Sequence, residues 1–184
     1  MIFLPPFILT GCSLARWWLY LGVALLMQII ALVVTPFLPL FAVERLGNSD
    51  NNKYQRIEPR LPLWLSWFDT PDNSLLGDTR FRQLNPETYW SKVRWLYRNR
   101  LYGFKWTVLS TAVQQERTVV GNVDIGYQGQ RFGSFTIKQP NGAWQYKIVK
   151  PLFGRTYEGN FGWLLDDVSK QRALFMFSIR LKKG

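Results

Sequence analysis

The pattern of hydrophobic and polar positions changes twice along the chain. Residues 17–43 contain no charged side chain, residues 44–62 are polar and rich in turn-forming residues, and apolar positions alternate with polar ones after residue 104. About 20 apolar residues, at 1.5 Å each, cross the hydrocarbon core of a bilayer. The pattern therefore predicts an apolar N-terminal region (1–43) with a transmembrane helix, then a surface linker, and then β-strands.

The predicted transmembrane helix begins near Ser13 or Leu14 and ends at Pro36, whose ring interrupts the backbone hydrogen bonding of a helix. Residues 36–41 are expected to be irregular. The basic side chains flanking the helix lie mainly on its C-terminal side, which predicts a cytoplasmic C-terminal domain. An aromatic belt that anchors the helix at one membrane interface would consist of Trp17, Trp18 and Tyr20.

The chain contains one cysteine, Cys12, and no histidine. Residues 9–12 fit a bacterial lipobox, but residues 1–8 lack the basic start of a signal peptide and contain two prolines, so lipidation is not expected. Without histidine, Ser-His-Asp and Cys-His catalysis and most zinc sites are excluded. We predict a protein that is not an enzyme and holds no cofactor.

Residues 63–184 are predicted to form one basic α+β domain. It opens on the apolar, aromatic residues 63–68, followed by a proline turn with the candidate turn motif Asp69, Asp72 and Asn73. These residues and Asp78 offer four oxygen ligands of the kind that Ca²⁺ or Mg²⁺ accepts, which keeps a metal-dependent enzyme open as a third class of function. The spacing is not that of an EF-hand loop, so capping of turns and helices is the favoured interpretation.

A helix is predicted from residue 86 to residue 101, with Asn85 as N-cap and Gly103 as its stop. Tryptophan and tyrosine alternate with basic side chains along it, a pattern that suits lipid headgroups or stacking on nucleic-acid bases. Packing of this helix on a sheet is the favoured structural interpretation. The candidate residues for binding a membrane or a partner are Lys92, Arg94, Trp95, Arg98 and Arg100.

The alternation after residue 104 predicts an antiparallel β-meander that curls into a small barrel or sandwich, with Trp144 and Trp163 largely buried. Glycines and the sequence Pro-Asn-Gly at 140–142 separate the strands. The expected strands are 104–113, 117–127, 132–138, 143–150 and 172–181, with a further one within 154–165.

The residues after 43 include 22 basic and 12 acidic side chains, a formal excess of ten positive charges. This excess favours anionic lipid headgroups, nucleic acid or an acidic protein as partners.

The most distinctive stretch of the chain is WLSWFDTPDN at 64–73, and further recognisable stretches are 38–42, 95–104, 162–165 and 177–180. Through these stretches the chain resembles a family of uncharacterised small membrane proteins of tailed bacteriophages. The resemblance implies a phage origin and a location in the host inner membrane, and it supplies no activity and no site residue.

We therefore expect a membrane-anchored accessory protein of a phage, whose basic aromatic domain binds a host or phage protein or the membrane surface. The alternatives are a membrane-tethered β module that binds nucleic acid or lipid, and an accessory protein for lysis.

Overall fold

The computed structural model describes residues 11–46, 57–125, 132–167 and 169–183. The chain divides into two compact units, Met1–Leu21 with Leu109–Gly184 and, separately, Gly22–Val108. We call them the sheet unit and the helical unit. This division differs from the single domain predicted for residues 63–184, because it places the first turns of the apolar helix with the C-terminal strands.

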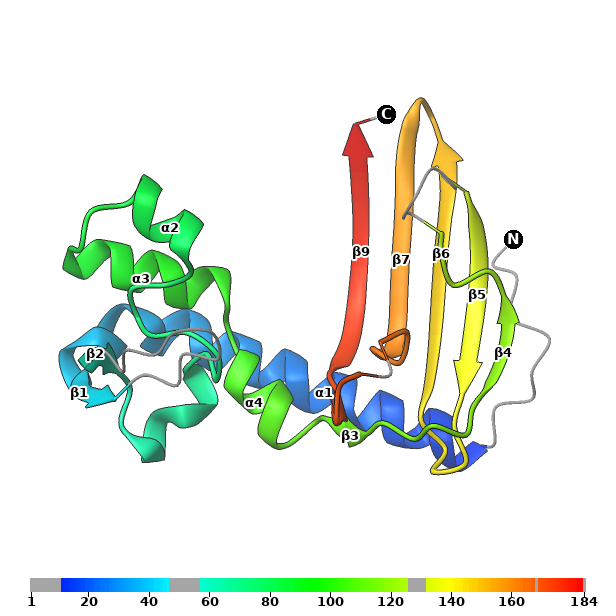
Figure 1. Ribbon diagram of the computed structural model, residues 1–184, viewed down its shortest axis with the longest axis horizontal. Helices are drawn as coiled ribbons and strands as arrows, with labels where there is room; N and C mark the ends of the chain where they lie inside the picture. The colour runs from blue at the N-terminus through cyan, green and yellow to red at the C-terminus, as the bar shows by residue number, and fades with distance from the viewer. Residues whose placement is uncertain (1–10, 47–56, 126–131, 168, 184) are drawn as a thin grey trace. The chain divides into compact units, whose positions relative to one another are not determined.

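The helical unit combines short helices with one pair of strands (Figure 1). Its first element is the C-terminal part of α1 (Gly11–Val34), which continues directly into the 3₁₀ helix η1. The elements after α1 are η1 (Thr35–Phe41), β1 (Val43–Leu46), β2 (Ile57–Arg60), the 3₁₀ helix η2 (Leu63–Phe68), α2 (Thr79–Leu84), α3 (Tyr89–Arg98) and α4 (Tyr102–Thr107).

The core of the helical unit is made of leucines from separate elements. Leu38 of η1 and Leu96 of α3 are both almost completely buried. They form one cluster with Leu61, Leu65 and Leu75. The segment that follows the apolar helix is therefore part of the core and has regular 3₁₀ structure, so the expectation of an irregular segment at 36–41 was wrong.

Three local predictions in this unit are corrected. The polar segment 44–62, expected to be a linker, contributes strands β1 and β2, which pair antiparallel. The helix expected from 86 to 101 is shorter: Thr88 caps it, and it ends at Arg98. Leu101 then adopts a left-handed conformation (φ 61°). The helix α4 follows, and it takes the place of the first part of the strand that was expected from residue 104.

The sheet unit contains a five-stranded antiparallel sheet with the order β4-β5-β6-β7-β9 (Figure 1). Both β4 and β9 are edge strands, so the sheet is open and the predicted barrel does not close. A second, two-stranded sheet pairs β3 with β8. The strands are β3 (Thr111–Ala112), β4 (Thr118–Gly121), β5 (Gly133–Lys138), β6 (Trp144–Leu152), β7 (Arg155–Trp163), β8 (Arg172–Ala173) and β9 (Phe175–Lys183).

The first turns of α1 lie at the end of the sheet where β6 and β9 begin and β7 ends (Figure 1). The Trp17 ring is 5.6 Å from that of Trp144 and 6.1 Å from that of Phe175, measured between centroids. Trp163 is fully buried, and its indole N–H donates to the Leu109 carbonyl at 2.9 Å. The prediction that Trp144 and Trp163 are buried is confirmed.

Candidate functional site

The α1 segment inside the helical unit presents apolar side chains to the outside. Between residues 22 and 34 every exposed position is apolar or glycine, whereas Ala24 and Ala31 face the interior. Among the described residues, the segment Cys12–Phe41 is the one stretch long and apolar enough to cross a membrane. The large exposed side chains of this part of α1 are Leu25, Leu26, Ile29, Ile30, Leu32 and Val33.

The same exposed surface continues beyond α1. Phe37, Leu40 and Phe41 of η1 are exposed, and the ring of Phe41 meets Trp64 edge to face at 5.7 Å. Trp64 itself is 71% exposed. An uncharged group of this size exceeds what a water-soluble monomer usually exposes. We call these α1 and η1 side chains, together with Leu63 and Trp64, the apolar surface.

Of the three residues predicted to form an aromatic belt, only Trp18 is exposed. Trp17 is buried against the sheet. Tyr20 is half-buried, and its ring lies 6.0 Å from that of Trp163 and 6.2 Å from that of Phe175. Two of the three predicted membrane-anchor side chains are therefore used for packing within the sheet unit.

The candidate binding residues predicted on the helix that corresponds to α3 differ in their exposure. Trp90, Arg94 and Arg98 are exposed and follow one another at four-residue intervals on α3, so they share a helix face. Trp95 points inward, where it packs on Phe81 and donates to the Thr70 hydroxyl at 3.2 Å. The buried indole of Trp95 belongs to the core and is not available to a membrane or partner.

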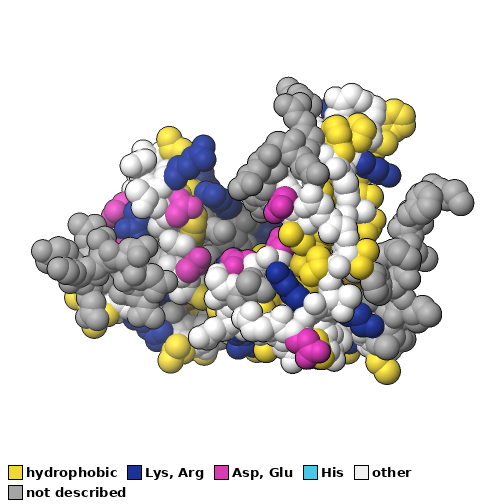
Figure 2. Space-filling view, turned by 45° about the vertical axis from the view of Figure 1, so that its right-hand side comes forward, with side chains coloured by type: hydrophobic (Ala, Val, Ile, Leu, Met, Phe, Trp, Pro, Cys, Tyr) yellow, Lys and Arg dark blue, Asp and Glu magenta, His cyan; other side chains and the backbone are white. Residues whose placement is uncertain are grey.

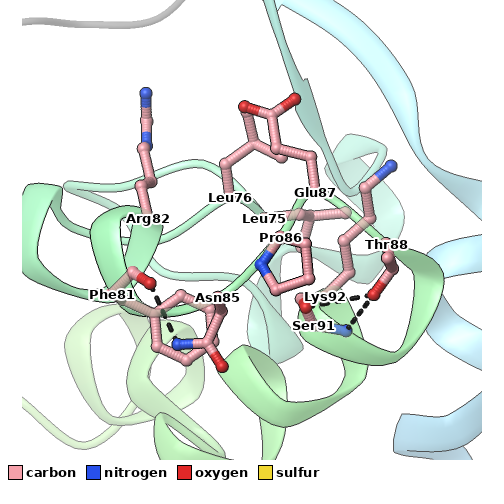
Figure 3. Close-up of a pocket in the computed structure, with 10 residues that line it drawn as sticks. All are labelled: Leu75, Leu76, Phe81, Arg82, Asn85, Pro86, Glu87, Thr88, Ser91 and Lys92. Carbon is pink, nitrogen blue, oxygen red and sulfur yellow. Dashed lines mark hydrogen bonds between the residues drawn. The ribbon is translucent and has the colours of Figure 1, made fainter.

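The two remaining members of the predicted set, Lys92 and Arg100, lie outside this exposed face of α3. Arg100 follows the end of α3, and its guanidinium lies 5.6 Å from the centre of the Tyr97 ring. Lys92 lines a shallow hollow between α2 and the start of α3 (Figure 3). The hollow is closed on one side by the cap of α3, in which the Ser91 N–H donates to the Thr88 hydroxyl at 3.3 Å.

The carboxylates in and after the predicted turn motif hold the local backbone in place through hydrogen bonds. The carboxylate of Asp69 accepts hydrogen bonds from the backbone N–H groups of Thr70 and Leu61, at 2.9 and 3.3 Å. Burial raises the pKa of Asp69, and these hydrogen bonds partly oppose that rise. Asp78 caps α2 by accepting from the Phe81 N–H at 2.7 Å. The distinctive WLSWFDTPDN block thus fixes the path of the chain around Trp95.

The carboxylates of this region do not form a metal site. Asp72 is exposed, whereas Asp69 is buried and already accepts two hydrogen bonds. Across the residues whose placement is described, no three or more Asp, Glu or Cys side chains gather closely enough to hold a metal ion. Burial lowers the pKa of Lys105 on α4.

A second apolar surface lies on the sheet. Phe161 stacks on Tyr146 with ring centroids 6.4 Å apart and meets Phe177 edge to face at 5.8 Å. Ile179 and Leu181 continue this face along β9, and both are exposed. At the tip of the β6–β7 hairpin, Phe153 is 96% exposed with a positive φ of 48°. Figure 2 shows hydrophobic side chains along the upper part of the sheet with basic side chains beside them.

Sequence reasoning missed this sheet face, although a signal for it exists. Phe177, Ile179 and Leu181 alternate with polar or basic residues in β9, as in a strand with one apolar face. Alternation marks the apolar face, but it does not say whether another layer covers that face.

Comparison with known families gives one assignment. Residues 9–184 match a family of unknown function, DUF7338, and the chain belongs to that family. No curated protein matches the chain. No solved structure matches it either.

Proposed function

We propose that the chain is a non-enzymatic membrane protein, attached to the bilayer through the apolar surface and drawn to anionic headgroups by its basic side chains. One observation carries this proposal: every exposed position of α1 within the helical unit is apolar or glycine. The core helix of a soluble protein would have these side chains buried. Each large apolar side chain left in water forgoes roughly 1.5–3 kcal/mol of transfer free energy.

The net charge of +11 supports an anionic partner. The exposed stripe of Trp90, Arg94 and Arg98 suits a headgroup layer, where an aromatic ring and guanidinium groups are both favourable. The phage origin, the host inner membrane and the cytoplasmic side remain proposals that rest on the resemblance and on the distribution of basic residues.

The first test is alkaline carbonate extraction of membranes from cells that express the full chain. We expect the chain to stay in the pellet, and the double variant Leu25→Glu with Ile29→Glu to move into the supernatant. The control is Thr118→Glu, at an exposed position on β4, which should leave the chain in the pellet. Release of the unaltered chain by carbonate would refute attachment to the bilayer through the apolar surface.

The second test examines the basic stripe in the full chain. Vesicles of phosphatidylcholine alone compete with vesicles that also contain phosphatidylglycerol, and the share of protein on each is measured. Each basic group near an anionic surface contributes about 1 kcal/mol. Arg94→Gln with Arg98→Gln should therefore lower the preference for anionic vesicles about thirtyfold at low salt. The control, Lys170→Gln with Arg172→Gln, removes the same charge from exposed positions of the sheet unit.

A specific observation also favours a second candidate function. The aromatic face of Tyr146, Phe161 and Phe177 extends over three neighbouring strands, as in sheets on which nucleic-acid bases stack. Single-stranded RNA is therefore added to the vesicle competition. Displacement of the chain from anionic vesicles by RNA, lost in Phe177→Ala, would favour this function over the membrane-surface proposal.

A further inference from the structure

We propose that α1 lies along a membrane surface instead of crossing the bilayer, with the apolar surface sunk into the outer part of an anionic leaflet. This inference rests on the proposed function, because it specifies how the membrane segment meets the lipid. The inference follows from three observations: the packing of each end of α1 against protein, the short length of helix between these two packed ends, and the distribution of apolar side chains on α1.

Within the sheet unit, the start of α1 is bound to protein. Trp17 and Leu21 are both buried, and Trp17 contacts Trp144 and Phe175. The guanidinium of Arg16 lies 4.7 Å from the centre of the Trp163 ring. Residues 13–21 therefore have a protein surface on one side and cannot be surrounded by hydrocarbon while the sheet unit is folded.

Within the helical unit, the end of α1 and η1 are bound in the same way. Ala31 is fully buried, and Leu38 belongs to the leucine core. Two hydroxyls of α3 donate to backbone carbonyls here: Tyr97 to Leu32 at 3.0 Å, and Tyr89 to Pro36. The helix that supplies these donors also carries the exposed arginines, each of which costs roughly 2.5–3.5 kcal/mol at the centre of a bilayer.

The part of the helix between these two attachments is too short to cross a membrane. Residues 22–30 measure about 14 Å at 1.5 Å per residue, less than half of a hydrocarbon core of about 30 Å. The chain also passes from the helical unit to the sheet unit between residues 108 and 109. Among the described residues no second segment could carry it back across the bilayer.

The distribution of side chains on α1 fits a helix lying flat. Ala24, Ala31 and Thr35 are buried, Met27 and Gln28 are half-buried, and the large side chains that are exposed in this stretch are all apolar. An interfacial helix sinks its apolar face about 5–10 Å into the boundary between headgroups and acyl chains. Here the opposite face is covered by protein. Trp64 and Phe41 add aromatic rings, which favour the interface, and the positive net charge complements anionic headgroups.

Labelling with a membrane-impermeant maleimide tests the topology in the full chain. Three single-cysteine proteins are compared in spheroplasts and in inverted membrane vesicles: the natural Cys12, and, in a Cys12→Ser background, Thr79→Cys and Lys170→Cys. All three positions are exposed. A flat helix places them on one side of the membrane, so all three should label in the same preparation. A transmembrane α1 separates at least one of them from the others, and that result would overturn the proposal. If Cys12 does not react, Ala15→Cys in the same background replaces it.

Nitroxide labels at Leu25, Ile29 and Val33 then measure depth in phosphatidylcholine–phosphatidylglycerol vesicles. We expect the same shallow depth in the bilayer for the labels at these three exposed positions. A label at the buried position, in Ala24→Cys, should be inaccessible both to oxygen and to a water-soluble nickel complex. A crossing helix would change depth by about 12 Å between Leu25 and Val33, because eight residues rise 1.5 Å each. Shielding of all exposed positions from both reagents would mean that a protein, such as a second copy, covers the surface, and would refute the lipid contact. Carbonate release of the unaltered chain would instead refute the proposed function itself.

Discussion

Replacing Trp163 by alanine should strongly destabilise the sheet unit. The side chain is fully buried, and its ring packs edge to face on Phe175 and Tyr20. Loss of a buried tryptophan typically costs about 3–5 kcal/mol. The Leu109 carbonyl, which accepts from the indole, would also lose its partner, at a cost of about 1–3 kcal/mol. Because the two costs overlap, we expect a total near 5 kcal/mol.

Two further variants separate the contributions. Trp163→Phe keeps an aromatic ring and removes the N–H, so it should cost about 2 kcal/mol. Trp64→Ala removes the same side chain from an exposed position and should cost less than about 1 kcal/mol. The measurement is urea unfolding of the full chain in mild detergent, followed by circular dichroism. A cost below about 1 kcal/mol for Trp163→Ala, or equal costs for Trp163→Ala and Trp64→Ala, would refute the assigned packing.

The remaining predictions concern one close backbone approach and two titrating groups. Gly103→Ala should destabilise the helical unit by about 3 kcal/mol, because a Cβ would lie 2.0 Å from the Ser66 carbonyl oxygen; Gly22→Ala, with nothing within 4 Å, should be neutral or stabilising in the same unfolding assay. The Lys182 hydrogen bond lowers the pKa of Glu158 below 4.5, so its stabilisation is present above that pH and is lost as the pH falls further. Burial raises the pKa of Asp69 above 3.8, so its carboxylate lowers stability as the pH rises through that region. The urea unfolding midpoint is measured as a function of pH. Glu158→Gln should abolish the loss of stability at low pH, and Asp69→Asn should abolish the loss of stability as the pH rises. If both variants and the unaltered chain have the same pH profile, both assignments are contradicted.

The local signals in the sequence were sufficient for much of the secondary structure. The uncharged run, whose first proline is Pro36, gave a helix that extends to Val34, close to the proline that was expected to end it. Alternation of apolar and polar residues located β5, β6 and β9, and the Pro-Asn-Gly sequence marked the β5–β6 turn, where Gly142 has a φ of 78°.

The errors arose where tertiary contacts decide the structure. Gly103 was interpreted as a helix stop, but it lies inside α4, where its lack of a side chain permits close contact with η2. The segment beginning at Phe104 has strand-forming residues, yet Phe104 packs against Trp67 as part of a helix. Trp95 and Arg94 are neighbours in the sequence, and only the placement of α3 shows that one is buried and the other exposed.

The sequence predicted the long apolar helix, but not which of its side chains pack against protein. The absence of charge in residues 17–43 indicated a membrane segment, but a composition cannot show that Trp17 is committed to the sheet. That contact joins residues separated by more than a hundred positions, and no local pattern encodes such a pairing.

The packing of Trp17 on Phe175 also has a consequence for synthesis. The ring that anchors the start of α1 finds its partner 158 residues later in the chain. At roughly 5–20 residues per second, the ribosome needs on the order of 10–30 s to supply that partner. During this interval the apolar side chains at the start of α1 have no sheet to pack against. A chaperone or lipid would therefore have to cover them. The order of synthesis thus makes closure of the sheet over Trp17 a late event, and under the proposed function contact with the membrane would come before it.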